Sequence, residues 1–312
     1  MRPLYKDDVI GVVSPASSAE LSVFKTMKEI AEQQGFRLKV FGAGEVNFGR
    51  MSATDERRLM HLRDAFHDEE VRAVVCARGG YGSGRLLKSI QPDLAKDKIF
   101  VGYSDATNLL LHLNKHAGII PFHGPMVSDL AQKQDPRSIE WFFSTLKGER
   151  LSYTLSPQDF TLMRAGKACG PVFGGNISTI ETLVGTDSLT VPEGAILMLE
   201  DVNEFMYKFD RALVHLDRAG FFDNAAGIIF GDLRLKDDMN RDNSLGLLLE
   251  EVLDVHFGKF NGPVVYKLPC GHTAQQMTLP IGTSATLDAR TDQLKLEYDD
   301  FWDRTAVDTI AA

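Results

Sequence analysis

A serine lies where an apolar strand is expected to turn into a helix. Residues 99–101 are typical of a buried strand, and Leu109, Leu110 and Leu113 recur at helical spacing. The intervening sequence GYSDA places Ser104 on a short turn that loosely matches the sharp nucleophile turn G-x-S-x-G, with alanine in place of the last glycine. The partial positive charge at a helix start favours a reacting oxygen there. Ser104 is therefore a candidate nucleophile, although a serine at this position is equally typical of a helix cap.

A serine hydroxyl is a weak nucleophile until a base removes its proton, and histidine is the usual base. His272 lies on a glycine-flanked loop in LPCGHT, and His123 follows an apolar strand in PFHGP. We prefer His272, because a loop histidine held by the scaffold is the more mobile base. The other six histidines lie on or near predicted helices, where packing and surface roles are typical.

A carboxylate must then orient the histidine and stabilise its charged form. Glu200 directly continues the apolar run AILML, so it is expected at the carboxyl end of a buried strand. A solvated acidic loop explains the following Asp201 and Glu204 well enough, but it explains Glu200 less well. The chain order of the three groups is serine, glutamate, histidine.

The glycine loop RGGYGSGR covers residues 78–85. It matches neither the dinucleotide motif G-x-G-x-x-G nor the phosphate-binding P-loop. Glycines after a strand also let backbone N–H groups approach a reacting carbonyl, so Gly79 or Gly80 could complete an oxyanion hole with the N–H of Asp105. A plain turn explains this loop equally well. No His, Asp or Glu group shows metal-ligand spacing, so we expect no metal and no cofactor.

The elements that must position these groups alternate between strand and helix over the first 125 residues. Helices are expected over 19–35, 52–68 (with Ser52 or Thr54 as the cap) and from residue 106. Strands are expected in DVIGVVS, RLKVFG, VRAVVC, KIFVGYS and GIIPFHG. This alternation predicts an α/β fold with a Rossmann-like, doubly wound parallel sheet, whose ligands bind outside the carboxyl ends of the strands.

The sequence predicts two domains joined by a linker. Residues 1–148 form the N-terminal domain, the weakly periodic, polar stretch 149–168 forms the linker, and 169–312 form a second mixed α/β domain with more β character. In the second domain we expect helices over about 178–186, 207–220 and 244–257, with short strands up to about residue 298.

Composition narrows the classes of partner. The chain has 34 basic and 43 acidic residues, a net charge of −9 and no Lys/Arg-rich block, which argues against nucleic acid or an anionic membrane as a partner. The three cysteines are scattered and form no CxxC pair, which is typical of reduced thiols. No apolar stretch has the length of a membrane span or a secretory signal. We therefore expect a cytoplasmic protein.

Several stretches taken together resemble the LD-carboxypeptidases, a serine-peptidase family that also contains the microcin C immunity hydrolases. They are ARGGYGSGRLL, VGYSDATNLLL, FHGPM, VFGGNISTIETLVGT, LMLEDVNEFMYKFDRALVHL and LPCGHT. The resemblance extends from GVVSPAS to about residue 290, and the order and spacing of these motifs make it specific.

The resemblance implies a serine-type LD-carboxypeptidase with a Ser104–Glu200–His272 triad. The nucleophile lies in the Rossmann-like domain, and the second domain supplies the glutamate and histidine. The oxyanion hole then uses the N–H of Asp105 and that of Gly79 or Gly80. Many members of the family are homodimers.

The activity that the resemblance implies is release of the terminal D-alanine from murein tetrapeptides in cell-wall recycling. Two alternatives stay open. One is hydrolysis of a microcin C-type peptidyl or acyl adenylate with the same triad, and the other is a nucleotide- or sugar-binding module without catalysis. The preferred third stem residue (diaminopimelate or lysine), the residues that bind the substrate carboxylate and the dimer interface are not apparent from the sequence.

Overall fold

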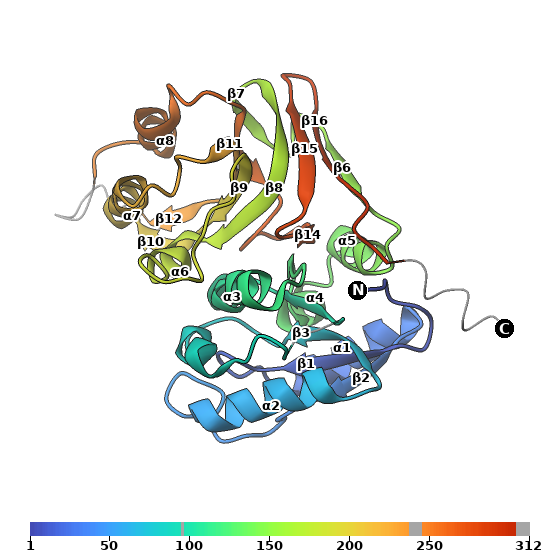
Figure 1. Cartoon of the computed structure of the whole chain (residues 1–312). Helices are drawn as coiled ribbons and strands as arrows, with labels where there is room; N and C mark the ends of the chain where they lie inside the picture. The colour runs from blue at the N-terminus through green and yellow to red at the C-terminus, as the bar shows by residue number, and fades with distance from the viewer. Residues whose placement is uncertain (95–96, 237–244, 304–312) are drawn as a thin grey trace. The chain divides into compact units, whose positions relative to one another are not determined.

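The computed structural model describes residues 1–94, 97–236 and 245–303, which form two compact units (Figure 1). The first unit contains Met1–Leu151 and Ala274–Ile281, together with the segment from Asp300 onward. The second unit contains Ser152–Thr273 and Gly282–Asp299. Each unit has its own sheet, and we describe the two units separately.

The sheet of the first unit has the strand order β14-β5-β4-β3-β1-β2 among the described residues. Its parallel strands are β1 (Val9–Val13), β2 (Arg37–Val40), β3 (Val71–Cys76), β4 (Ile99–Gly102) and β5 (Phe122–His123). The edge strand β14 (Leu279–Pro280) is antiparallel to β5. The carboxyl ends of β1, β3 and β4 therefore bring the loops with SPAS, RGGYG and GYSD to one edge of the sheet.

Helices cover both faces of this sheet, which is why its central strands β1, β3 and β4 are apolar on both sides. One face carries α1 (Leu21–Gln33), α4 (Val127–Lys133) and α5 (Pro136–Leu146). The other carries α2 (Asp55–His67), the 3₁₀ helix η1 (Ser83–Ser89) and α3 (Thr107–Ala117). Strand β1 shows the alternation, since Ile10 and Val12 pack on the first face and Val9 and Val13 on the second.

The second unit is built on a mixed sheet with the order β6-β16-β15-β8-β9-β11-β13-β7 among the described residues. Its parallel centre contains β8 (Gly166–Asn176), β9 (Ala195–Glu200), β11 (Ala225–Gly231) and β13 (Val264–Leu268). Its antiparallel strands are β6 (Ser152–Leu155), β7 (Thr161–Arg164), β15 (Ser284–Ala289) and β16 (Leu294–Tyr298). The expected fold class, a doubly wound parallel sheet followed by a more β-rich mixed unit, is confirmed.

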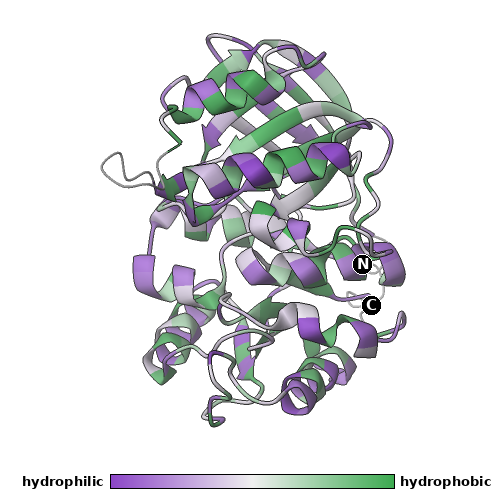
Figure 2. Cartoon of the chain, turned by 90° about the vertical axis from the view of Figure 1, so that its left-hand side faces the viewer, coloured by the Kyte–Doolittle hydropathy of each residue, from purple (hydrophilic) through white to green (hydrophobic). Residues whose placement is uncertain are grey.

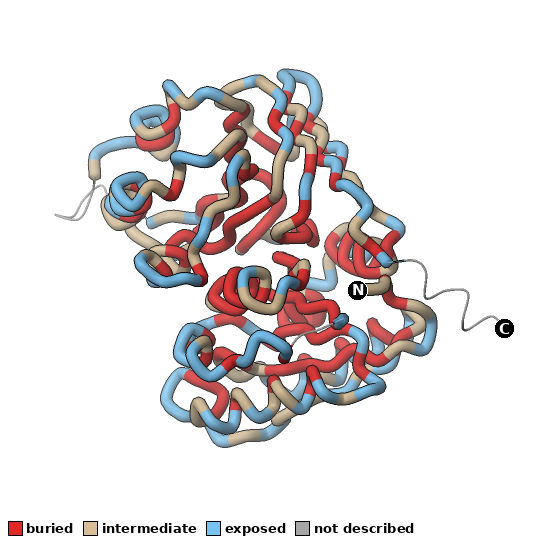
Figure 3. The backbone as a smooth tube through the Cα atoms, viewed as in Figure 1, coloured by how far each residue is buried: buried red, intermediate tan, exposed pale blue. Residues whose placement is uncertain are grey.

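Among the described residues, three helices and a two-stranded sheet complete the second unit. The helices are α6 (Ile177–Glu181), α7 (Met206–Arg218) and α8 (Leu249–Phe257), and the small parallel sheet pairs β10 (Val202–Phe205) with β12 (Arg234–Lys236). The helix expected over 244–257 begins at Leu249, and its residue 244 lies outside the described residues. The helices carry hydrophilic and hydrophobic residues on different faces (Figure 2). The central strands of both sheets are buried (Figure 3).

Residues 149–168, which the sequence predicts to be a linker, contain β6 and β7 and the first residues of β8. Both β6 and β7 lie at the ends of the strand order, so in the described part of the chain each pairs on one side only. In the part of the chain that the structure describes, every helix is too short or too polar to cross a membrane.

Candidate active site

Ser104 lies on a strained turn between β4 and α3. The short 3₁₀ helix η2 (Ser104–Ala106) joins the two elements, and Ser104 has a φ of 60°, in the left-handed region that costs a non-glycine residue about 1–2 kcal/mol. Two residues earlier, a Cβ on Gly102 would lie 2.8 Å from the Cβ of Ala106 and 3.0 Å from the Sγ of Cys76. Only glycine fits that approach without movement of its neighbours. Strain of this kind at a strand–helix turn is typical of functional sites.

The glycine loop after β3 packs directly against this serine. A Cβ on Gly79 would lie 2.9 Å from the Cβ and 3.1 Å from the Oγ of Ser104, so the backbone reaches the hydroxyl only because residue 79 has no side chain. Ser17 N–H donates to the Gly79 carbonyl at 3.2 Å. The peptide is trans, so the N–H of Gly80 points to the side opposite Ser17. The loop thus provides the close backbone approach that a plain turn would not require.

Asp105 joins the serine turn to the glycine loop. Its carboxylate accepts hydrogen bonds from the N–H of Gly82 (3.2 Å) and of Ser83 (2.8 Å). In return, Ser83 Oγ donates to the Asp105 carbonyl at 2.6 Å. Sequence reasoning assigned Asp105 only a backbone role and missed this carboxylate. The only signal was an acidic residue in the first turn before a helix, which is too common to be specific.

Glu200 and His272 form a hydrogen-bonded pair within the second unit. The Nδ1 of His272 lies 2.7 Å from Glu200 Oε2 at the end of β9. The Glu200 side chain is 0% exposed and that of His272 is 21% exposed. Because an ionised carboxylate can only accept, Nδ1 carries the proton and Nε2 is left as the basic nitrogen. This is the arrangement that a general-base histidine needs.

Two glycines pack against the Glu200 side chain. A Cβ on Gly271, whose φ is 81°, would lie 2.5 Å from Glu200 Oε2. A Cβ on Gly231, at the end of β11, would lie 3.1 Å from the Glu200 Cβ. The glycine of the GH dipeptide therefore lets His272 approach the acid, which gives a physical reason for the LPCGHT motif.

The expectation for Asp201 is wrong: it is not part of a solvated loop. Asp201 is 3% exposed, and its carboxylate accepts from the Nδ2 of Asn176 (3.2 Å) and the Oγ of Ser178 (2.7 Å). It also accepts from the N–H groups of Ser178 (3.0 Å) and Val202 (2.8 Å). Burial raises the pKa of Asp201, the Ser178 bonds oppose this, and the neighbouring Glu200 charge adds to it. Asp201 therefore fixes the start of α6 beside Glu200, whereas Glu204 is partly exposed.

His123, the less favoured base, is 0% exposed within the first sheet. It lies on β5 between β4 and β14, and its ring meets that of Tyr103 edge-on at 5.7 Å. The Tyr103 hydroxyl in turn donates to Asp129 Oδ1 at 3.0 Å. His123 thus packs beneath the residue that precedes Ser104, where burial leaves it little access to substrate.

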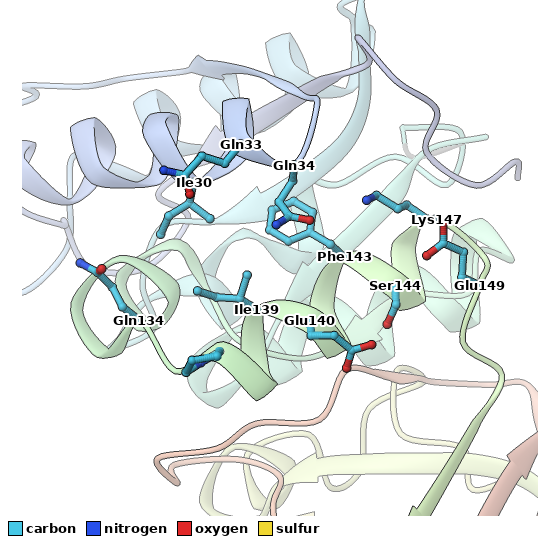
Figure 4. Close-up of a pocket in the computed structure, with 11 residues that line it drawn as sticks. Ile30, Gln33, Gln34, Gln134, Ile139, Glu140, Phe143, Ser144, Lys147 and Glu149 are labelled. Carbon is cyan, nitrogen blue, oxygen red and sulfur yellow. The ribbon is translucent and has the colours of Figure 1, made fainter.

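A separate pocket of about 430 Å³ lies between α1 and α5 in the first unit (Figure 4). Ile30, Ile139 and Phe143 supply its apolar part, and glutamine, lysine and glutamate side chains surround them. None of the predicted site residues lines it. Across residues 1–94, 97–236 and 245–303, no group of three or more His, Cys, Asp or Glu side chains could hold a metal ion.

Comparison with known proteins decides the family. The model of the LD-carboxypeptidase N-terminal domain matches residues 10–124, and that of the C-terminal domain matches residues 169–287. A Bacillus subtilis protein named "probable murein peptide carboxypeptidase" is 32% identical over 291 residues, which cover 92% of this chain and 91% of the relative. The chain belongs to the LD-carboxypeptidase family. As a member, it is a serine-type carboxypeptidase, and the resemblance drawn from the motifs is confirmed.

Other LD-carboxypeptidase relatives agree over nearly the whole length. The murein tetrapeptide carboxypeptidase of Pseudomonas aeruginosa is 27% identical and aligns with 90% of this chain and 94% of its own. The crystal structure of muramoyltetrapeptide carboxypeptidase from Oxalobacter formigenes has a TM-score of 0.85 at 26% identity, covering 95% of this chain and 100% of that one. The microcin C7 self-immunity protein MccF, in complex with aspartyl sulfamoyl adenosine, shares the fold with a TM-score of 0.87 at 24% identity, over 97% of this chain and 99% of that one.

Proposed function

We propose that this LD-carboxypeptidase releases the terminal D-alanine from murein tetrapeptides by a Ser104–Glu200–His272 triad. The hydrogen bond between the buried Glu200 carboxylate and His272 Nδ1 carries the proposal, because it leaves Nε2 as a base. The strained turn at Ser104 and the relatives named for murein peptides support it.

In the proposed reaction, His272 Nε2 takes the proton of Ser104 Oγ as this oxygen attacks the carbonyl carbon before D-alanine. The resulting oxyanion accepts from the N–H of Asp105 and from the glycine loop, and one such donor contributes about 3–4 kcal/mol. His272 then gives its proton to the amine of the leaving D-alanine. A water molecule, activated by the same histidine, hydrolyses the ester on Ser104 and restores the hydroxyl.

The backbone geometry favours Gly80 over Gly79 as the second donor. The Gly79 carbonyl is held by Ser17, so the next N–H in the chain faces the other side of that peptide. Gly79 itself packs against the Ser104 side chain and leaves room for a carbonyl oxygen only because it lacks a Cβ. We therefore propose the N–H groups of Asp105 and Gly80 as the oxyanion hole, with Gly79 as the residue that permits the approach.

Release of D-alanine from L-Ala-γ-D-Glu-diaminopimelate-D-Ala, and from its lysine counterpart, tests the proposal. Ser104→Ala and His272→Ala should each lower kcat at least about 10³-fold while the thermal unfolding transition is kept. A fluorophosphonate that labels active serines should modify the wild type, fail to modify Ser104→Ala and modify His272→Ala slowly. Near-normal D-alanine release by Ser104→Ala would contradict the assignment.

The same assay separates the alternatives that the sequence left open. Aspartyl sulfamoyl adenosine, an analogue of an acyl adenylate, is offered beside the tetrapeptide and reports hydrolysis of that substrate class. Preference for that compound would replace the murein substrate and keep the triad. Membership in a carboxypeptidase family already sets aside a module without catalysis.

We also propose that the protein is located in the cytoplasm and forms a homodimer. Within the described residues none of the three cysteines forms a disulfide, and Cys76 and Cys270 are buried, as is typical of a reducing compartment. Light scattering of the purified protein and cell fractionation measure the two properties directly.

A further inference from the structure

A buried arginine lies under the loops that surround Ser104 in the first unit. Arg58 on α2 is 1% exposed. Its Nε donates to the Ala53 carbonyl at 3.2 Å, and its Nη1 donates to the carbonyls of Gly82 (2.8 Å) and Pro15. Its Nη2 contacts Asp55 Oδ1 at 2.5 Å, which balances the charge. Burial of a guanidinium is costly unless its donors are used in this way, so its position requires an explanation.

The carbonyls that Arg58 binds come from three different loops. Pro15 follows β1, Ala53 precedes α2, and Gly82 ends the glycine loop after β3. Two residues after Pro15, Ser17 donates to the Gly79 carbonyl, and Gly79 lies three residues before Gly82. Arg58 thus holds the loop segments on both sides of the hydrogen bond that orients the Gly79–Gly80 peptide.

The peptides around Gly82 are held from a second direction. Its carbonyl accepts from Arg58, while its N–H and that of Ser83 donate to the Asp105 carboxylate. Gly82 has a φ of 118°, and a Cβ there would lie 3.0 Å from Arg58 Nη1. A cation and a carboxylate therefore fix this end of the glycine loop, and Asp105 also follows the nucleophile directly.

We propose that Arg58 is a positioning residue for the oxyanion hole, because its guanidinium fixes the loops whose backbone orients the Gly80 N–H. The proposal rests on the proposed function of Ser104 and its oxyanion donors. Arg58 makes no contact with substrate in this role. A lysine in its place keeps the charge but cannot present donors in the same planar fork.

The test compares Arg58→Lys and Arg58→Ala with the matched pair Arg57→Lys and Arg57→Ala. Arg57 is the preceding residue on α2, is exposed and pairs with Glu45. We expect both Arg58 variants to lower kcat for D-alanine release about 10- to 100-fold with KM within about twofold of the wild type. The Arg57 variants should match the wild type.

A tetrahedral inhibitor distinguishes positioning from a merely structural role. The affinity of a peptide boronate, which forms an anionic adduct on Ser104, should fall in proportion to kcat, whereas that of a ground-state peptide with an uncleavable bond should not. Guanidinium chloride, added to Arg58→Ala at concentrations that leave the wild type unchanged, should restore part of kcat. Unchanged kcat and boronate affinity in folded Arg58→Lys would overturn the proposal.

Two controls keep the outcome interpretable. If the Arg58 variants fail to fold, Gly82→Ala moves the same loop with Arg58 present, since its Cβ would lie 2.7 Å from Met51 Cγ. It should show the same loss in kcat and boronate affinity, and wild-type values in that variant would count against the proposal.

The rate of fluorophosphonate labelling can be measured without a natural substrate. If the wild type labels but releases no D-alanine, the proposed function fails, while slower labelling of Arg58→Lys still supports the role of Arg58.

Discussion

At the scale of single residues, the side chains that could react are held by residues with no reactive group. Glycine at 79 lets the backbone reach Ser104, and glycine at 271 lets the histidine loop reach Glu200. At both positions a Cβ would lie too close to a neighbouring side chain, so glycine is required for space and not only for its backbone conformation. Replacement of either glycine should therefore disturb the reaction more than it disturbs the fold.

Gly271→Ala tests this point in the second unit. Its Cβ would lie 2.5 Å from Glu200 Oε2, so the histidine loop or the carboxylate must move, and we expect kcat to fall about 10- to 100-fold. Gly185→Ala is the matched control, because Gly185 has the same φ of 81° but no atom within 4 Å of a Cβ. Both variants should lose about 1–2 kcal/mol of stability from the backbone alone. Steady-state kinetics and thermal unfolding measure the two effects, and wild-type kcat in Gly271→Ala would refute the prediction.

At the scale of elements, the start of α2 is capped by the residue before it, and its side chains bind the neighbouring loops. Thr54 is the N-cap, accepting from the Arg57 N–H, while Ser52, the other cap expected from the sequence, donates instead to the Ser14 carbonyl at 2.6 Å. Asp55, in the first turn, pairs with Arg58 and with Arg85 at 2.7 Å. The start of this helix therefore holds three charged side chains in contact, Asp55, Arg58 and Arg85, which we call the charge junction.

Asp55→Asn should show how this junction depends on pH. Hydrogen bonding from Arg85 first, and from Arg58, lowers the pKa of Asp55 below its ordinary value of 3.8. A lowered folded-state pKa contributes stability that is present above 3.8 and lost as the pH falls through the folded-state value. We expect Asp55→Asn to be about 1–3 kcal/mol less stable than the wild type at pH 7, with a gap that narrows at successively lower pH below 3.8.

Urea unfolding at each pH measures the gap between the two proteins. Glu56→Gln, at the exposed neighbouring position in the same turn, is the control and should stay close to the wild type. A gap of constant size from neutral to acid pH would show that the Asp55 charge does not contribute.

Local pattern predicted the strands and helices up to about residue 123 well, because most of these strands are buried on both faces and the helices are amphipathic, but it did not predict α4 and α5. It predicted the turn at Ser104 and the place of Glu200 at a strand end for the same reason. The pattern failed where pairing is one-sided or distant. Strands β6 and β7 lie at the ends of their sheet and have only four residues each. Burial alternates along β6, but all four residues of β7 are partly exposed. Strand β14 pairs with β5 across more than 150 residues of sequence.

In the candidate site, too, the features that depend on distant contacts were the ones that the sequence could not show. The contact between His272 and Glu200 joins residues 72 positions apart. The residue types and the predicted strand end made both residues candidates, and the family resemblance added to that choice, but the sequence could not show the contact itself. The burial of Asp201 depends on donors from Asn176 and Ser178, which lie on another strand and helix. The proposed role of Arg58 depends on hydrogen bonds to three backbone carbonyl groups. Because every residue has a carbonyl group, the sequence does not show which ones an arginine binds.

At the scale of the whole molecule, the chain passes between the two units four times, near residues 151, 273, 281 and 299. The first unit therefore takes its last pieces from distant sequence. Leu279 on β14 is fully buried, and Trp302 is 6% exposed and stacks on Phe122 with ring centroids 5.7 Å apart. These residues cover apolar surface that residues 1–151 alone would expose.

A fragment of residues 1–148, the predicted N-terminal domain, should accordingly fail to fold cooperatively. It lacks both β14 and Trp302, and loss of one buried aromatic side chain alone costs about 3–5 kcal/mol. Near-UV circular dichroism and a thermal melt compare the fragment with the full chain. In the full chain, Trp302→Ala should be destabilised by about that amount, and a sharp melt of the fragment near that of the full chain would contradict the prediction.

The repeated passage of the chain has a consequence for biosynthesis. A ribosome makes Ser104 before any of the second unit, but the unit that holds this serine stays incomplete until residues 300–303 have been made, after the whole of the second unit. Each nascent chain therefore carries the proposed nucleophile without the finished scaffold around it while the whole of the second unit is being made. We therefore expect hydrolytic competence only after residues 300–303 have been made, so that chains ending before them should not cleave substrate.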